Sequence, residues 1–375
     1  MDKNWELELE EYIRQGEPEK KDKRNAWKTA IGLQDVDGLK TSDYLLETAK
    51  EHIDGKISIT EVDKRIHSYY EERKDRDEIE LDTKEADIVS VRITKLLGEK
   101  TFQFSPAEWQ NIHRRLFEGL FSHAGKFRDY NITKKEWVLK GDTVMYASFD
   151  SIPATLNYDF DQEKNFSYRG LSLSDSIRHI ARFTSGIWQI HPFGEGNTRS
   201  TAVFIIKYLR SLGFNVNNTT FEKNSWYFRN ALVRANYQNL QKGIYKETIH
   251  LERFFRNLLM GEDNVLMNRY LHIKAKELLE GVTHTSAHTS THTSLVPEND
   301  NIKRLVEALG NQQLSVKEIL EAIGLKNRPS FVEYSLSPAI SEGYVRMLYP
   351  HSPRHPRQKY LLTVKGLAAY KELNG

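Results

Sequence analysis

The ten residues HPFGEGNTRS, at positions 191–200, constrain the fold of this chain more than any other stretch. They gather a histidine, a carboxylate, two glycines, an asparagine, an arginine and hydroxyls between two apolar segments, FTSGIWQI and TAVFIIKYLRSLG. The apolar flanks predict two buried helices. The polar stretch is therefore a turn on a rigid scaffold, which is a common setting for binding and catalysis.

The turn opens the second helix, and this position favours an anion. The first N–H groups of a helix lack internal partners, and the helix dipole adds positive potential there. Gly194 and Gly196 let the backbone approach phosphate oxygens, and Asn197 can cap the helix or bind an anion. Arg199 stands close behind Asn197 and can reach a phosphate with its planar guanidinium.

Two further side chains in the turn suit phosphoryl chemistry. Glu195 is a hard oxygen ligand, and one carboxylate together with substrate phosphates is a usual way to hold Mg²⁺. His191 can accept a proton near neutral pH. Each residue alone has a structural explanation, as a capping histidine, a solvated acid or the partner of a carboxylate. Their combination at a helix start predicts nucleotide chemistry, although the turn lacks the Gly-Lys-Ser/Thr ending of a P-loop.

Length and composition set the wider frame. The chain has 375 residues, which predicts two or three domains, and a net charge of +2, which neither favours nor excludes nucleic acid. It has no cysteine, so disulfides and thiolate chemistry are excluded. The charged start has no apolar core of a signal peptide, and no apolar run approaches the roughly 20 residues that span a bilayer. We expect a soluble cytoplasmic protein with no membrane contact.

Helical periodicity runs through most of the first 260 residues. Residues 42–55 form one such segment, with Ser42 as a cap and Gly55 as a stop. The pattern changes at KKEWVLKGDTVMYAS, residues 134–148, where two β-prone runs flank Lys-Gly-Asp and predict a hairpin. SIPATLNYDFDQ, residues 151–162, is interpreted as a polar loop.

The last third of the chain divides into a linker and a small domain. Residues 282–294, VTHTSAHTSTHTS, repeat histidine every four residues, a spacing that could bind a metal on a helix. Because Thr and Ser fill the gaps, we interpret them as a linker. Residues 300–375 show three helical patterns, a basic hairpin and a last helix, which predict a winged helix-turn-helix.

The motif HPFGEGNTR resembles the signature of the Fic family, His-Pro-Phe-x-(Asp/Glu)-Gly-Asn-x-Arg. GKFRDYNI, the predicted hairpin and WYFRNALVRANY look like further Fic features, so the resemblance covers roughly residues 90–260. It implies a Fic-type helical core with a β-hairpin flap, and together with the predicted C-terminal winged helix-turn-helix this gives a mainly α fold. It also implies transfer of AMP from ATP, with Mg²⁺ or Mn²⁺, to a Ser, Thr or Tyr hydroxyl of a protein target, or of the enzyme itself.

The resemblance also assigns roles to the motif residues. His191 would be the base, Phe193 the loop anchor and Glu195 the metal ligand. Gly196 and Asn197 would form the anion hole, and Arg199 would bind the outer phosphates. The other residues that it implies are nucleotide contacts at Gly194, Thr198 and Asn236, and flap contacts to the target at Val144 and Tyr146.

The N-terminal segment resembles the helical antitoxins that inhibit Fic domains, through residues 37–66. In that group, a Ser/Thr-x-x-x-Glu-(Gly/Asn) motif places its Glu on the motif arginine. Here Ser68 and Glu72 fit the spacing, but Arg73 follows; Asp37, in the stretch VDGL, is the other candidate inhibitory acid. Asp is one methylene shorter than Glu, so we expect weak autoinhibition.

These patterns divide the chain into an antitoxin-like segment (1–89), a Fic core (90–262), a helix with linker (263–299) and a winged-helix domain (300–375). Two alternative functions remain open: a DNA-binding regulator built on a Fic-like scaffold, and a Fic transferase with another donor. The helix at 327–344 is poor in basic residues, so we expect the wing, with Arg354 and Arg357, to make any DNA contact. The sequence leaves the oligomeric state open.

Overall fold

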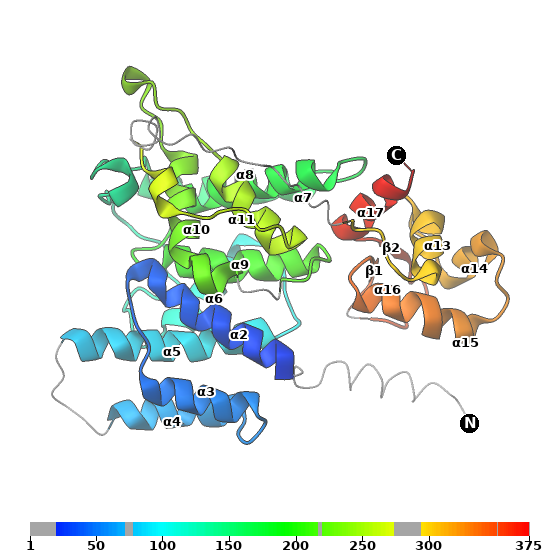
Figure 1. Ribbon diagram of the computed structural model, residues 1–375, viewed down its shortest axis with the longest axis horizontal. Coiled ribbons are helices and arrows are strands. Elements are labelled where there is room, and N and C mark those ends of the chain that lie inside the picture. Colours follow the sequence, from blue (N-terminus) through cyan, green and yellow to red (C-terminus); the bar gives the residue numbers. More distant parts are fainter. Residues whose placement is uncertain (1–19, 72–77, 217–219, 274–293, 351, 375) are drawn as a thin grey trace. The chain divides into compact units, whose positions relative to one another are not determined.

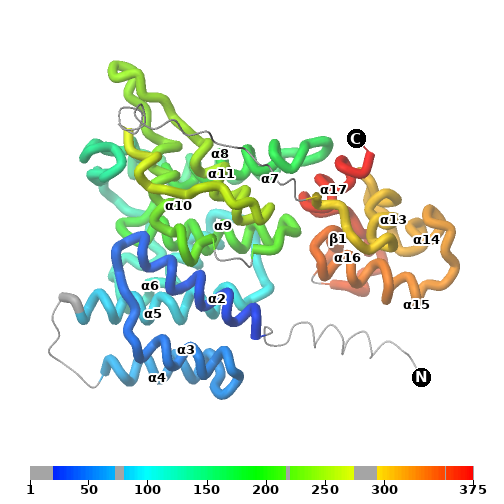
Figure 2. Tube along the Cα trace, in the orientation of Figure 1, coloured from blue at the N-terminus to red at the C-terminus, as the bar shows by residue number. Residues whose placement is uncertain are grey.

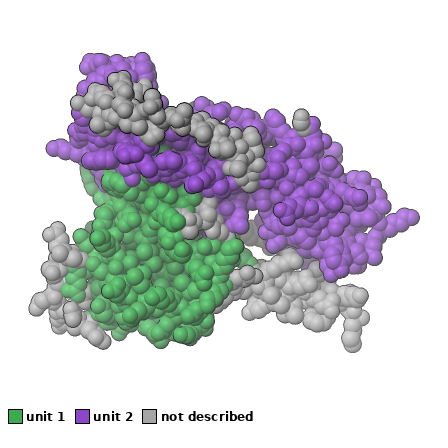
Figure 3. Space-filling view, in the orientation of Figure 1, with its two compact units in different colours: residues 1–131, 191–204, 217–229 green, residues 132–190, 205–216, 230–375 purple. Residues whose placement is uncertain are grey.

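The computed structural model describes residues 20–71, 78–216, 220–273, 294–350 and 352–374. They fall into two compact units, coloured in Figure 3. Unit 1 comprises residues 1–131, 191–204 and 217–229, and unit 2 comprises 132–190, 205–216 and 230–375. The described part of the chain is mainly helical, as predicted. None of its helices is both long and apolar enough to cross a membrane.

All secondary-structure elements in the described residues of unit 1 are helices. Its elements are α2 (Lys20–Gly32), η1 (Leu33–Asp37), α3 (Asp43–Ile53), α4 (Ile59–Glu71), α5 (Glu78–Gly98), α6 (Pro106–Phe117) and the first turns of α9 (Asn197–Ser211) and α10 (Thr220–Asn236). Figure 2 follows α2 to α5 as neighbouring tubes, with α2 packed on α5 and α3 on α4. The predicted boundary at residue 89 falls inside α5.

Local sequence signals explain where these helices begin. The Ser42 hydroxyl accepts a hydrogen bond from the N–H of Leu45, as predicted for a cap, and Ser105 does the same for Glu108 at the start of α6. Ser42 also donates to the buried carboxylate of Asp87 on α5, which accepts from Tyr70 on α4 at 2.8 Å. One buried carboxylate therefore joins α3, α4 and α5.

Unit 2 contains the remaining elements. Before the C-terminal domain these are η2 (Trp137–Leu139), η3 (Phe149–Ser151), α7 (Ile152–Asn165), α8 (Leu173–Ile190), the rest of α9 and α10, η4 (Leu240–Lys242), α11 (Ile249–Met260) and η5 (Asn268–Leu271). The interpretation of 151–162 as a polar loop is wrong, because α7 begins there. Ile152, Leu156 and Phe160 recur every four residues and bury one face of this helix.

The predicted β-hairpin flap is also wrong in its secondary structure. Residues 136–142 close into a tight turn, in which Glu136 N–H donates to Asp142 C=O at 2.9 Å, but the described residues on either side form no strand ladder. Val138 and Leu139 are adjacent and both buried, which a strand with one face inward cannot achieve. The segment instead forms the 3₁₀ turn η2.

The C-terminal domain has the predicted order of elements. It contains α13 (Asp300–Leu309), α14 (Val316–Ile323), α15 (Arg328–Phe331), the π-helical turn η6 (Val332–Leu336), α16 (Ser337–Ser341), β1 (Val345–Met347), β2 (Tyr360–Leu362) and α17 (Val364–Asn374). The strands are antiparallel, with Val345 opposite Leu362 (Figure 1). The predicted linker at 282–294 lies outside the described residues.

Candidate active site at the start of α9

The motif begins with a strained backbone. α8 ends at Ile190, and His191 then takes φ +51°, a left-handed conformation that few residues other than glycine adopt. Arg128 holds this bend: its N–H donates to the carbonyl of Pro192 and its Nε to the carbonyl of His191, both at 2.8 Å. His191 is only 3% exposed. Strain of this kind persists where surrounding contacts fix it, and it is concentrated at functional sites.

Phe193 anchors the loop, as the resemblance implies. It is fully buried, stacks on the ring of His113 at 3.7 Å and meets the edge of Trp109. Gly125 N–H donates to Nδ1 of His113, so the neutral ring carries its proton on Nε2 and donates to the carbonyl of Glu195 at 2.9 Å. Burial lowers the pKa of His113 to about 4. This imidazole is therefore neutral at pH 7 and supports the loop on both sides of Gly194.

Asn197 fastens the loop to the helix. Its Oδ1 accepts from the N–H of Phe193 at 3.0 Å, and its Nδ2 donates to the carbonyl of the same residue at 2.7 Å. The Oδ1 and Nδ2 atoms of Asn197 are thus both hydrogen-bonded to the backbone of Phe193. Any contact of Asn197 with an anion would come from its backbone N–H, while the side chain holds the shape of the turn.

The two glycines of the loop allow neighbouring side chains to approach its backbone closely. Gly196 has φ +75°, and a Cβ there would lie 2.3 Å from the ring of Phe117. A Cβ on Gly194 would lie 2.8 Å from the hydroxyl of Tyr130. Thr198, also predicted to contact the nucleotide, is buried at the start of α9. The backbone N–H groups at this helix start are those predicted to face the phosphates.

Glu195 is the partly exposed acid of the motif. One of its oxygens accepts from the N–H of Gly196 at 3.2 Å. Within the described residues, no group of three or more His, Asp or Glu side chains is arranged to hold a metal ion. A single carboxylate beside a phosphate-binding helix start fits Mg²⁺ that arrives with a nucleotide, because phosphates then supply the other oxygens.

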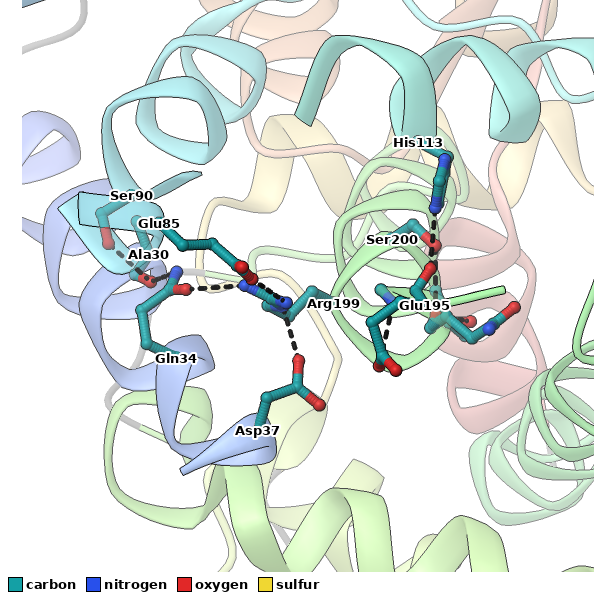
Figure 4. Close-up of polar contacts among 12 residues, drawn as sticks. Ala30, Gln34, Asp37, Glu85, Ser90, His113, Glu195, Arg199 and Ser200 are labelled. Atoms are coloured by element: carbon teal, nitrogen blue, oxygen red, sulfur yellow. Dashed lines mark hydrogen bonds and ion pairs between the residues drawn. The ribbon is translucent and has the colours of Figure 1, made fainter. Parts of the chain in front are cut away.

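Arg199 is held by groups from the N-terminal helices (Figure 4). Its side chain is 1% exposed. Nε lies 2.7 Å from Oδ2 of Asp37, and the two terminal nitrogens donate to Glu85 at 2.6 Å and to Gln34 at 3.2 Å. The guanidinium also lies 4.9 Å from the ring centre of Phe117. Asp37, one of the two candidate inhibitory acids, thus contacts the motif arginine, whereas Glu72 lies outside the described residues.

Two of these partners were not predicted. Glu85 lies on α5 and Gln34 on η1, and neither belongs to a local motif. Gln34 is fully buried, and its Nε2 donates to the carbonyl of Ala30 at 2.9 Å, which points its oxygen at Arg199. Gln34 stands three residues before Asp37, and residues at this spacing on a helix lie on the same face. This spacing could have indicated from the sequence that Gln34 faces the same side as Asp37.

The remaining predicted residues lie in unit 2 and are described there alone. Asn236 is buried and donates to the carbonyls of Ser185 and Leu232, both at 3.0 Å. In the flap segment Val144 is buried, and the hydroxyl of Tyr146 lies 3.4 Å from Glu136. Tyr237 donates to the carboxylate of Asp142 at 2.7 Å and ties the flap turn to the end of α10.

Comparison with known proteins agrees with this site. Residues 103–209 match the Fic/DOC family, and residues 300–363 match the Filamentation induced by cAMP protein Fic-like, C-terminal domain. The matched residues 103–209, which include the motif, are therefore similar to Fic domains, and residues 300–363 are similar to the C-terminal domain of Fic-like proteins.

Two individual proteins are similar to this chain. Protein adenylyltransferase VbhT of Bartonella schoenbuchensis is 25% identical over 114 residues, which are 30% of this chain and 23% of VbhT. The chain thus spans less than a quarter of that relative's length. The crystal structure of a Fic family protein from Desulfovibrio desulfuricans G20 covers 91% of this chain and 87% of its own, with 18% identity and a TM-score of 0.41.

Proposed function

We propose that this chain is a protein adenylyltransferase, which transfers AMP from ATP to a hydroxyl side chain of a protein and releases pyrophosphate. The observation that carries the proposal is the complete motif at the start of α9. Its loop is preorganised by Arg128, His113 and Asn197, and it includes a base, an acid and a buried arginine. The Fic domain match and the adenylyltransferase relative support the same reading.

Each residue then has a role in the reaction. His191 takes the proton of the target hydroxyl, whose oxygen attacks the α-phosphorus. The backbone N–H groups at the start of α9 bind the phosphate oxygens, and Arg199 binds the outer phosphates that leave as pyrophosphate. Glu195 would hold Mg²⁺ or Mn²⁺, which supplies positive charge to the phosphates when bound.

The site also explains how activity would be restrained. Arg199 can bind phosphates only after it releases Asp37, Glu85 or both, because these carboxylates occupy the N–H groups at Nε and at one terminal nitrogen of its guanidinium. We propose that the N-terminal segment inhibits the transferase by this competition. The expected acceptors of AMP are a hydroxyl group of a target protein and a hydroxyl group of the chain itself.

The decisive experiment compares two labels on ATP. With α-phosphate-labelled ATP and Mg²⁺, label should become covalently attached to protein, and with γ-labelled ATP it should not. Covalent transfer of the γ-label would assign a kinase instead. Competition by CTP, GTP or UTP tests the donor, and label transfer from one of these in preference to ATP would assign the alternative donor.

A further inference from the structure

A groove runs between α7 and α8 in unit 2, outside the motif and its contacts. The two helices lie side by side (Figure 1). The groove has a volume of about 280 Å³. Its lining residues are Asp159, Gln162 and Glu163 from α7, Phe166 directly after the end of α7, and His179, Arg182, Phe183 and Gly186 from α8.

Glu163 lines one wall of the groove, and both of its carboxylate oxygens already have hydrogen-bond partners. Glu163 is buried, and its Oε1 accepts from the hydroxyls of Tyr168, at 2.6 Å, and of Tyr208. Its Oε2 lies 2.5 Å from Nε2 of His179. Burial raises the pKa of both tyrosines well above their ordinary range, so they remain neutral donors. The charge of Glu163 is therefore already compensated, and its neighbours hold the wall in place.

Asp159 differs from Glu163 in having no such compensation. Its side chain is half-buried, and no residue in the described part of the chain makes a hydrogen bond or ion pair with it. Burial raises its pKa. Gly186 lies next to this carboxylate: a Cβ there would lie 3.6 Å from Oδ2, in van der Waals contact, so a side chain larger than a methyl group would crowd the carboxylate. A half-buried charge without a partner costs free energy that a bound cation would recover.

Aromatic rings complete the surroundings. Phe166 stacks face to face on His179 at 3.4 Å, and Phe183 also lines the groove. Aromatic rings near a carboxylate suit a guanidinium or alkylammonium group better than an anion. Arg182 lies on the groove too, but its side chain is exposed, and within the described residues no ion pair joins it to Asp159.

We propose that this groove binds a guanidinium or alkylammonium group, with Asp159 as its counter-charge and Gly186 as the opening that admits it. The group belongs either to a free amine or to an Arg or Lys side chain of a partner protein. Both sources share the same chemistry, and the proposal does not depend on the proposed transferase activity.

Calorimetric titration of the full chain with agmatine, a small guanidinium compound, tests the proposal. We expect saturable binding that weakens at least about tenfold in Asp159→Asn, since the counter-charge is removed. Gly186→Leu fills the groove and should abolish binding. Asp161→Asn makes the same charge change on the same helix but outside the groove, and should bind agmatine as the unaltered chain does.

Two further arms identify the source and guard against misfolding. A glycine-flanked arginine peptide that binds as tightly as agmatine assigns the site to a partner's side chain, and weaker peptide binding assigns it to a free amine. A second peptide, which carries uncharged citrulline in place of the arginine, is the control for charge. The proposal is overturned if agmatine shows no saturable binding, if Asp159→Asn binds it equally, or if the citrulline peptide binds as tightly as agmatine. Thermal unfolding of each variant verifies that lost binding is not lost structure.

Discussion

The Nε atom of Arg199 lies 2.7 Å from Oδ2 of Asp37, and a second carboxylate, Glu85, lies 2.6 Å from another nitrogen of the same guanidinium. One buried arginine is thus shared by two acids and the amide oxygen of Gln34. The shorter side chain of Asp37 is not a handicap here, because η1 brings its backbone close to α9 and Glu85 adds a second charge. The inhibition that we propose for this segment would consequently rest on several groups rather than one.

This sharing predicts how inhibition is released. Asp37→Ala alone should raise AMP transfer by less than about tenfold, because Glu85 and Gln34 still hold Arg199. Asp37→Ala combined with Glu85→Ala should raise it by a further factor of about ten or more. Initial rates with α-labelled ATP measure both, and Asp35→Ala on the same short helix is the matched control. A double variant no faster than the single one would show that Glu85 does not restrain the site.

The second prediction concerns the base. His191→Ala should reduce transfer by about 10²–10⁴-fold, the usual loss when a general base is removed, while ATP binding is largely kept. Label incorporation measures the rate of AMP transfer, and calorimetry measures the binding of ATP. Near-normal self-modification or target modification by this variant would exclude His191 as the base.

The third prediction separates the metal from the nucleotide. Because Glu195 is the single acid of the loop, Mg²⁺ alone should bind weakly, and ATP should make its binding much tighter. Titration of Mg²⁺ with and without ATP measures this, and Glu195→Gln should remove the difference. Tight binding of Mg²⁺ in the absence of nucleotide would contradict the assignment.

The fourth prediction follows from His113, whose pKa burial lowers from 6.5 to about 4. Between these values the unfolded chain binds a proton that the folded chain does not, so folding stability falls as pH drops from 7 towards 4. The loss attributable to this residue reaches about 3 kcal/mol. Urea unfolding at several pH values measures it, and His113→Gln should flatten the dependence whatever its effect at pH 7. An unchanged slope in that variant would assign the dependence to other groups.

The sequence predicts those features of the site that depend on residues close together in the chain. The order of residues 191–199 places a base, an acid and an arginine on one turn, and the caps at Ser42 and Ser105 act within four residues. Glu85 could not be found in this way, because its contact with Arg199 arises only when α5 packs beside α9.

The two errors in secondary structure have a related origin. Polar residues separate the apolar residues of α7 and favour a loop, yet Ile152 and Leu156 stand four apart and face one side of a helix. The β-prone residues of the flap segment favour strands, but Val138 and Leu139 are both buried, which a 3₁₀ turn allows and a strand with one buried face does not. Tertiary packing overrode propensity in each case.

The last prediction concerns DNA and the C-terminal domain. The candidate recognition segment, from α15 through α16, is interrupted by a π-helical turn and exposes Glu333 and Tyr334, which suit a phosphate backbone poorly. Exposed Arg354 and Arg357 lie instead between β1 and β2. If the domain binds duplex DNA, replacing both arginines by Ala should remove the binding, and affinity for the unaltered chain should fall steeply with salt.

The matched control for this experiment is Lys303→Ala combined with Arg304→Ala, which removes two positive charges from α13 in the same domain. Fluorescence anisotropy with a labelled duplex at two salt concentrations measures all three proteins. Because a wing contacts phosphates rather than base edges, binding should also be insensitive to sequence. Sequence-specific binding that survives the loss of Arg354 and Arg357 at elevated salt would show instead that the helical segment reads bases. If the unaltered chain does not bind the duplex, the domain does not contact DNA, and the exposed Glu333 and Tyr334 would then be expected to contact a protein.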